Sequence, residues 1–100
     1  DIKERCNRVS FPRVNTSNQH VFWQLVGFFP DTQNTQIKLQ KKGVDTATTS
    51  LTKISNLKNY NILTINENAD FIYSSGFFIP CHHSLTKKDL DYVCSSINSI

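Results

Sequence analysis

The longest apolar stretch of the chain constrains its fold more than any other feature. It reads "HVFWQLVGFF", from His20 to Phe29, and is rich in β-branched and aromatic residues. These residue types favour a strand, and apolar side chains at successive positions indicate a strand covered on both faces. Pro30 ends the stretch. In a domain of 100 residues, one helical layer covers only one sheet face. The second face is therefore either sandwiched or covered by something outside this chain, since large apolar patches usually mark interfaces.

End signals mark two helices further along the chain. Asp31 is a candidate N-cap, and Gly43 follows two lysines as the residue just beyond a helix end. Between them only two positions are apolar, so we expect a short and mostly exposed helix. Near the C-terminus, Thr86 and Asp89 form an acidic version of the capping box. The expected apolar face of this last helix consists of Leu90, Val93, Cys94 and Ile97. Cys94 is thereby expected in the core.

The remaining elements complete a small α+β fold. We expect strands within residues 44–54 and 76–80, and one or two helical turns over residues 69–75. The order of elements predicts a three-stranded, mainly antiparallel sheet with helices packed on one face. Residues 20–100 form this domain, and residues 1–19 read as a lead-in segment and a candidate tail of an upstream helix. The opening "DIKERC" is neither a signal peptide nor a start at Met, so we expect a fragment of a longer protein.

Composition and charge argue against several classes of protein. The net charge is only +3, and Lys and Arg are scattered among Asp and Glu, so we expect no nucleic-acid partner. No apolar run reaches the roughly 18 residues that a membrane span needs, so we expect no membrane partner. The three cysteines include no CxxC pair, which argues against a disulfide framework. Free thiols favour a reducing compartment, and we therefore predict a cytoplasmic protein.

The segment Cys81-His82-His83 raises the question of a metal site. Zinc needs about four ligands that converge on one ion, whereas adjacent residues of an extended segment point to opposite faces. We therefore predict no metal site and interpret the segment as a corner between a strand and a helix. A small metalloprotein that adds His20 to these three residues stays open as an alternative. Zinc retained through purification, and lost on Cys81→Ser, would support it.

No pattern predicts catalysis by these residues alone. Cys–His chemistry requires a histidine within hydrogen-bond reach of the thiolate, and adjacency in sequence does not supply that geometry. The three glycines are isolated, so no glycine-rich loop is present to hold a phosphate. We predict neither catalytic nor cofactor-binding residues within the chain.

Two segments resemble the DegT/StrS-type sugar aminotransferases. The stretch "HVFWQLVGFFPDTQNTQIKLQKKGVDT" is similar to the opening of their small domain, a hydrophobic strand followed by a polar helix. Its matching positions are Leu39, Gly43, Val44 and Asp45. The stretch "FFIPCHHSLTKKDLDYVCSSI" resembles the segment that closes the domain. Its matching positions are Ile79, Pro80, His82, Leu85, Thr86, Asp89, Asp91, Tyr92 and Val93. The resemblance covers about residues 20–100.

The resemblance implies a domain of a larger enzyme that uses pyridoxal phosphate. In that family the lysine that holds the cofactor, the aspartate that pairs with its ring nitrogen and most of the phosphate cradle lie in a large domain, which these residues lack. The small domain forms a wall of the active-site cleft, and the parent is expected to be a homodimer. Lys53 and Lys58 do not stand in a sequence context like that of the family's lysine, so we interpret both as surface residues.

One departure affects the expected substrate contacts. Many family members carry a His-Tyr-Pro type segment after the helix, where this chain reads "TATTSLTKIS". The candidate substrate-side residues are Thr48, Thr49, Ser50, His82 and His83. We thus expect the C-terminal domain of an enzyme that moves an amino group from glutamate to a keto-sugar. The alternative is a free-standing α+β module that binds a ligand or a protein through its apolar sheet face.

Overall fold

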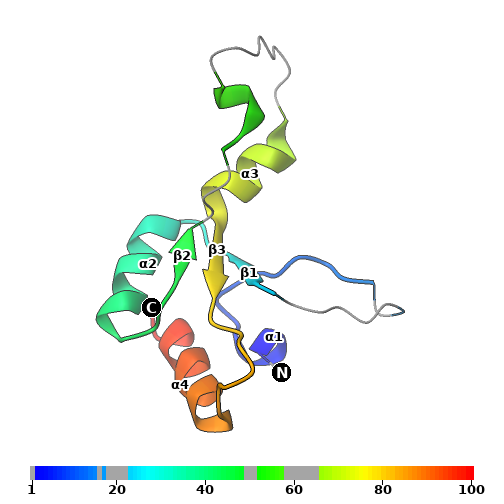
Figure 1. The fold of residues 1–100 in the computed structure, drawn as a ribbon. Coiled ribbons are helices and arrows are strands. Elements are labelled where there is room, and N and C mark those ends of the chain that lie inside the picture. The colour runs from blue at the N-terminus through cyan, green and yellow to red at the C-terminus, as the bar shows by residue number, and fades with distance from the viewer. Residues whose placement is uncertain (1, 16, 18–22, 49–51, 58–65) are drawn as a thin grey trace.

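A computed structural model describes residues 2–15, 17, 23–48, 52–57 and 66–100 (Figure 1). Within these ranges a small sheet is accompanied by helices, as expected for an α+β fold. The elements in chain order are α1 (Ile2–Arg5), β1 (Leu25–Phe28), α2 (Thr32–Lys41), β2 (Ala47–Thr48), the 3-10 helix η1 (Ile54–Asn56), α3 (Glu67–Ser75), β3 (Gly76–Ile79) and α4 (Lys87–Asn98). In the described ranges every helix is too short or too polar to span a bilayer.

The sheet is antiparallel throughout and has the strand order β1-β3-β2. Strand β3, the last in sequence, therefore lies in the middle (Figure 1). Leu25 pairs with Ile79 at one end of β1, and Phe28 pairs with Gly76 at the other. Ser10, from the segment after α1, makes an isolated bridge to Phe28. The predicted three-stranded antiparallel sheet is confirmed.

The first strand is shorter than the stretch from His20 to Phe29 that the sequence predicts. It covers Leu25–Phe28, because β3 offers only four residues for pairing. Trp23 lies in a bend and is 86% exposed, so it belongs to no strand. Residues 20–22 lie outside the described part of the chain. The length of the apolar run thus overestimates the length of the strand, because the ends of β1 are set by its pairing with β3.

The second strand and the third helix also differ from the prediction. Within the predicted strand of residues 44–54, only Ala47–Thr48 pair with β3, and η1 begins at Ile54. Residues 49–51 lie outside the described ranges. Helix α3 begins at Glu67, two residues before the predicted start, because the Asn66 side chain accepts a hydrogen bond from the Ala69 N–H.

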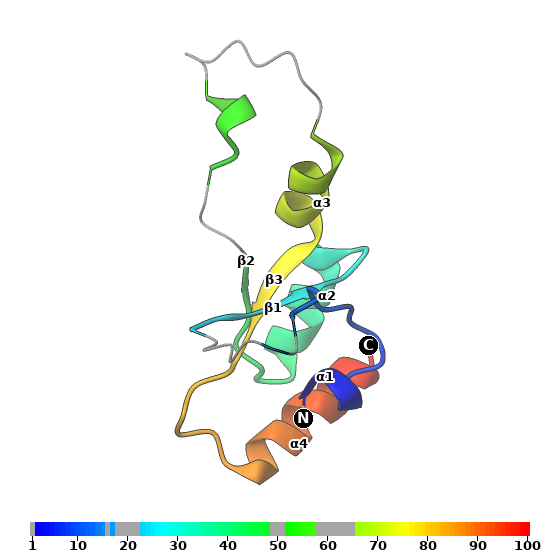
Figure 2. The ribbon, with the colours of Figure 1, turned by 90° about the vertical axis from the view of Figure 1, so that its right-hand side faces the viewer.

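Helices α2 and α4 cover one face of the sheet (Figures 1 and 2). Directly paired residues of an antiparallel sheet share a face, so Leu25, Gly27, Phe77 and Ile79 point the same way, and all four are buried. The covering side chains are Leu39 from α2 and Val93, Cys94 and Ile97 from α4. Cys94 is therefore in the core, as the helical spacing predicts, and helices lie over one face as expected.

The opposite face of the sheet, which we call the outer face, keeps apolar side chains within reach of solvent. Its members Val26, Phe28 and Phe78 are only half-buried, in contrast to their buried neighbours along the strands. Helix α3 extends beyond the end of the sheet and adds Phe71, whose ring centroid lies 5.3 Å from that of Phe28. Phe71 is 53% exposed. The predicted second apolar face thus exists and is only partly covered.

The ends of α2 and α4 follow the predicted signals. Gly43 has φ +74°, a conformation that glycine adopts without strain, and its N–H donates to the Gln40 carbonyl. The Val44 N–H donates to the Leu39 carbonyl, which completes a Schellman motif. At α4, the Thr86 side chain and the Asp89 side chain form the expected capping box.

The segment before β1 contributes to the core. Cys6 and Val9 are buried in the same cluster as the sheet and α4. The sequence shows no apolar periodicity here, because the contacts come from scattered residues, with Ile2 and Phe11 packed against the same cluster. The lead-in therefore adds packing that pattern analysis did not anticipate.

Candidate functional site

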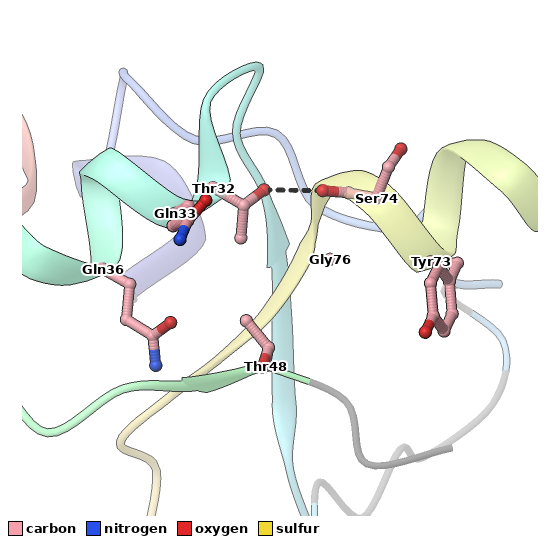
Figure 3. A pocket seen from close by; sticks show the side chains of 7 residues that line it. All are labelled: Thr32, Gln33, Gln36, Thr48, Tyr73, Ser74 and Gly76. Atoms are coloured by element: carbon pink, nitrogen blue, oxygen red, sulfur yellow. Dashed lines mark hydrogen bonds between the residues drawn. The ribbon is translucent and has the colours of Figure 1, made fainter. Parts of the chain in front are cut away.

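A pocket of about 300 Å³ opens where the first turn of α2, strand β2 and the end of α3 meet (Figure 3). The three elements are brought together by the sheet, since β3 follows α3 directly and pairs with β2. The lining residues are Thr32, Gln33, Gln36, Thr48, Tyr73, Ser74 and Gly76. None of them carries a charge, so the pocket presents hydroxyl and amide groups.

Asp31 fixes the turn of α2 that borders the pocket. Its carboxylate accepts hydrogen bonds from the Asn34 backbone N–H at 3.2 Å and from the Asn34 side-chain amide at 2.9 Å. The side-chain bond is the largest of the causes that hold the pKa of Asp31 below its ordinary value. The helix start predicted from Asp31 is thus confirmed, and it places Thr32 and Gln33 at the pocket.

Thr32 joins two walls of the pocket. It is buried, and its Oγ1 lies 3.1 Å from both the Phe29 and the Ser74 carbonyl oxygens. Figure 3 shows the bond to Ser74, which ties the start of α2 to the end of α3. Because its hydroxyl donates to the backbone, Thr32 positions the walls, and the exposed groups around it are the ones free to meet a ligand.

Gln36 holds the third wall. Its Nε2 donates to the Thr46 carbonyl at 2.9 Å, which joins α2 to the chain just before β2. In Figure 3 the amide of Gln36 points toward Thr48 on β2. With its NH₂ group engaged, the amide oxygen of Gln36 is the group that can accept a hydrogen bond from a ligand.

Gly76 lines the pocket at the point where α3 passes into β3. A Cβ atom at this position would lie 2.6 Å from the Ile72 carbonyl oxygen, a backbone atom that cannot move aside cheaply. The close approach of the last turn of α3 to the strand therefore requires glycine.

Two charged residues, Lys53 and Asp70, lie close to the lining residue Tyr73. Lys53 forms an ion pair with Asp70, and its ammonium lies 5.9 Å from the centroid of the Tyr73 ring. This pair connects the residues before η1 to α3. The pocket can bind by hydrogen bonding and by contact with an aromatic ring. The lining residues that the structure describes include no carboxylate or imidazole for acid–base catalysis.

The predicted substrate-side residues fall into two separate places. Thr48 lines the pocket, and Thr49 and Ser50 lie outside the described residues. His82 and His83 are exposed in the loop between β3 and α4, beyond Ile79. Thr48 lies near the Gly76 end of β3, so the structure does not bring it together with the histidines.

The corner at Cys81 uses its polar atoms locally. The Cys81 thiol lies 3.8 Å from the Trp23 carbonyl oxygen, and His82 Nδ1 lies 2.7 Å from the Ser84 hydroxyl. Among the described residues, no three side chains of Cys, His, Asp or Glu are grouped as metal ligands. His20, the other member of the alternative metal set, lies outside the described ranges.

Of the lining residues that the structure describes, the sequence analysis named Thr48 alone as a substrate-side candidate, and Gln33, Gln36 and Tyr73 are among those that it missed. A neutral polar residue on a short exposed helix looks like a solvated surface, and nothing in its spacing distinguishes a pocket wall. Their role arises from the packing of α2 beside β2 and α3, which is a tertiary property.

Comparisons with known proteins identify the fold. It matches part of a DegT DnrJ EryC1 StrS aminotransferase from Brucella abortus with a TM-score of 0.82 and 16% identity, over 98% of this chain and 28% of that one. It also matches an aminotransferase TlmJ from Streptoalloteichus hindustanus with a TM-score of 0.78 and 15% identity, over 98% of this chain and 29% of that one. The resemblance drawn from the sequence is thus confirmed as a shared fold.

The comparisons of sequence find no match. No family model fits the chain, and no curated protein matches it. The chain spans less than a third of the length of either aminotransferase that shares its fold.

Proposed function

We propose that this chain is the C-terminal small domain of a pyridoxal-phosphate-dependent aminotransferase that acts on a (nucleotide-)sugar. The observation that carries the proposal is the shared fold, in which nearly the whole chain matches about 28% of an aminotransferase of this type. The resemblance of residues 79–93 to the closing segment of the family supports the C-terminal position. On this proposal the reactive groups lie in the rest of the parent chain, and the isolated domain does not catalyse.

Pyridoxal phosphate needs a lysine that holds it covalently, an acidic partner for its ring nitrogen and donors for its phosphate. The described residues do not offer this set in one place. Lys53 is engaged by Asp70, and the pocket has no charged lining residue. We therefore assign the cofactor to the rest of the parent chain, where it would supply the electron sink for amino transfer.

The pocket is the part of this chain that we assign to the wall of the active-site cleft. Its uncharged donors and acceptors suit the hydroxyl groups of a sugar, and Tyr73 adds an aromatic surface. Thr48 is both a candidate substrate-side residue from the sequence and a lining residue of the pocket. His82 and His83 lie at the other end of β3, so we rank them below Thr48 as substrate contacts.

The outer face is the surface that we assign to the large domain of the parent. Half-buried Val26, Phe28 and Phe78, together with the exposed Phe71, would become covered there. Covering them would explain why the strands are apolar on both faces. As the resemblance implies, the parent would be a homodimer, and the free thiols of this chain favour the cytoplasm.

The test uses the parent enzyme encoded by the native gene. We expect it to transfer an amino group from glutamate to a nucleotide-linked keto-sugar. Thr48→Val keeps the size of the side chain and removes its hydroxyl, so the KM for the sugar should rise about 5- to 10-fold, as for one lost hydrogen bond. The KM for glutamate and the visible absorption of the cofactor should stay unchanged.

Thr52→Val is the matched control, because Thr52 is exposed and lies outside the pocket. It should leave both KM values unchanged. A parent that binds no pyridoxal phosphate, or an isolated chain that transaminates unaided, would overturn the proposed function. If Thr48→Val and the unaltered parent have equal KM values for the sugar, the pocket is not part of the sugar-binding site.

A further inference from the structure

The first residues of the chain run along α4 and are held there by specific contacts. The guanidinium of Arg5 lies 2.6 Å from the Asp91 carboxylate. The backbone N–H of Asn7 donates to the Asn98 side chain at 3.0 Å, and the Asn98 amide donates to the Arg5 carbonyl at 2.8 Å. The segment is thus anchored to the helix on both sides of Cys6.

The anchors hold Cys6 beside α4, the helix that carries Cys94. Cys94 lies three residues after Asp91 and four before Asn98, so all three share one face of α4. Both cysteines are 3% exposed, belong to the same core cluster and have free thiols. Burial, and after it the neighbouring thiol of Cys94, raises the pKa of Cys6 to about 12.

From this placement we propose that Cys6 and Cys94 form a dithiol pair, which a small-molecule disulfide oxidises to an internal disulfide bond joining the start of the chain to α4. The proposal does not rest on the proposed function. It adds a modification site that the reaction of an aminotransferase does not require.

The reaction takes place in two exchange steps with glutathione disulfide as the oxidant. One cysteine thiolate attacks a sulfur of the oxidant, whose S–S bond breaks and releases one glutathione thiol. The second cysteine thiolate then attacks the protein sulfur of the mixed disulfide and releases the other glutathione. The protein loses two protons and two electrons, and glutathione disulfide is reduced to two thiols.

Because both thiols are buried, we expect the disulfide to form slowly, as a structural bond and not as a fast redox sensor. A thiolate is the reacting species, and a raised pKa keeps Cys6 protonated at neutral pH. The oxidant also has to reach sulfur atoms that α4 and the first residues cover, so the segment must open first. Once formed, the bond is shielded from reductants in the same way. In a reducing compartment the same pair remains as two packed thiols.

The alternative is that the two buried cysteines act as small apolar side chains and have no redox role. The equilibrium for forming the bond distinguishes the two roles. Two thiols held in one buried cluster have a high effective concentration, whereas the unfolded chain must close a loop of nearly its full length.

The experiment uses the chain with Cys81→Ser, which leaves only the proposed pair. It is equilibrated in mixtures of reduced and oxidised glutathione, quenched by alkylation, and analysed by mass spectrometry and peptide mapping. We expect the loss of two hydrogens and a peptide that links Cys6 to Cys94. The equilibrium constant should be at least about 100-fold higher than for the same chain in concentrated guanidinium chloride. The oxidised form should melt on the order of 10 °C higher than the reduced form.

Cys6→Ser and Cys94→Ser on the same background are the matched controls, and each should accumulate only mixed disulfides with glutathione. Equal equilibrium constants under native and denaturing conditions would overturn the proposal. So would an accumulation of doubly glutathionylated chain without the internal bond. A reduced chain that melts at a higher temperature than the oxidised chain would show that the bond strains the fold, and would also overturn it.

Discussion

Single residues at the helix ends carry a defined pH dependence, and Asp89 is the clearest case. Its carboxylate accepts hydrogen bonds from the Thr86 hydroxyl at 2.6 Å and from the Thr86 backbone N–H at 2.8 Å. The hydroxyl bond is the larger cause, and together they lower the pKa of Asp89. A lowered folded-state pKa contributes stability above the unfolded-state pKa, and this contribution is lost as the pH falls through the folded value.

We therefore expect Asp89→Asn to destabilise the chain at neutral pH and to lose this effect in acid. The difference in unfolding free energy between the two proteins should shrink as the pH falls below about 4, where an unfolded aspartate becomes protonated. Urea unfolding at a series of pH values measures this difference. Asp31→Asn at the start of α2 is a parallel case and should show the same pH dependence, because its carboxylate is also held at a lowered pKa. Parallel pH profiles for Asp89→Asn and the unaltered chain would contradict the assignment.

Residue-scale signals were also the most predictable from sequence. Asp31, Gly43 and Thr86 were placed correctly, because a cap depends on a few neighbouring residues and on backbone geometry. Gln36 and Tyr73 were not placed at the pocket, because their role depends on elements that are distant along the chain. Local chemistry is readable from local sequence, whereas a pocket wall is not.

At the scale of elements, the strands show what the sequence leaves open. The apolar run to Phe29 located β1 correctly but not its start, because pairing stops where β3 ends at Ile79. The outer face of β1 was anticipated from the same run, since its alternate side chains are apolar too. Strand length and register are set by the partner, and no pattern within one strand contains them.

Gly27 tests how closely the lead-in packs against this strand. A Cβ atom at this position would lie 2.6 Å from Cγ2 of Val9 and 2.9 Å from Cδ1 of Ile79. We expect Gly27→Ala to lower the free energy of unfolding by about 1–3 kcal/mol, as overpacking of a core does. Chemical denaturation measures the loss.

A second substitution separates crowding from other effects of the alanine. Adding Val9→Ala removes the closest atom, so the double variant should be more stable than the sum of the two single effects predicts. Gly43→Ala is a useful contrast: nothing lies within 4 Å of the added atom, and φ is +74°. Its cost of about 1 kcal/mol would be backbone strain, which no change at Val9 relieves. Strict additivity at Gly27 and Val9 would show that the lead-in does not pack on β1 in this way.

At the scale of the whole molecule, the described residues form a sheet with one face covered by helices and the other face only partly covered. The sheet face under α2 and α4 has buried side chains, whereas the strand residues of the outer face are half-buried and α3 leaves large apolar groups exposed. Figure 1 shows α3 extending beyond the sheet, where it is available to a further layer. This chain matches only a small share of each aminotransferase. That supports the proposal that the rest of the parent chain forms this further layer. A free-standing module would instead keep this face for a separate ligand or protein.

Phe71 distinguishes these two roles. It is 53% exposed and packs at a tilt against Phe28 at the edge of the outer face, so a charge there should remain solvated in the isolated chain. We expect Phe71→Asp to change the melting temperature of the isolated chain little. Binding of this chain to the separately produced remainder of the parent should weaken at least about 10-fold, as for a buried aromatic anchor. Ile37→Asp is the control, because Ile37 is 45% exposed on α2, away from the outer face. Calorimetric titration measures both variants. Equal affinities for the two would mean that the large domain does not cover this face, and the apolar second side of β1 would then belong to a different partner.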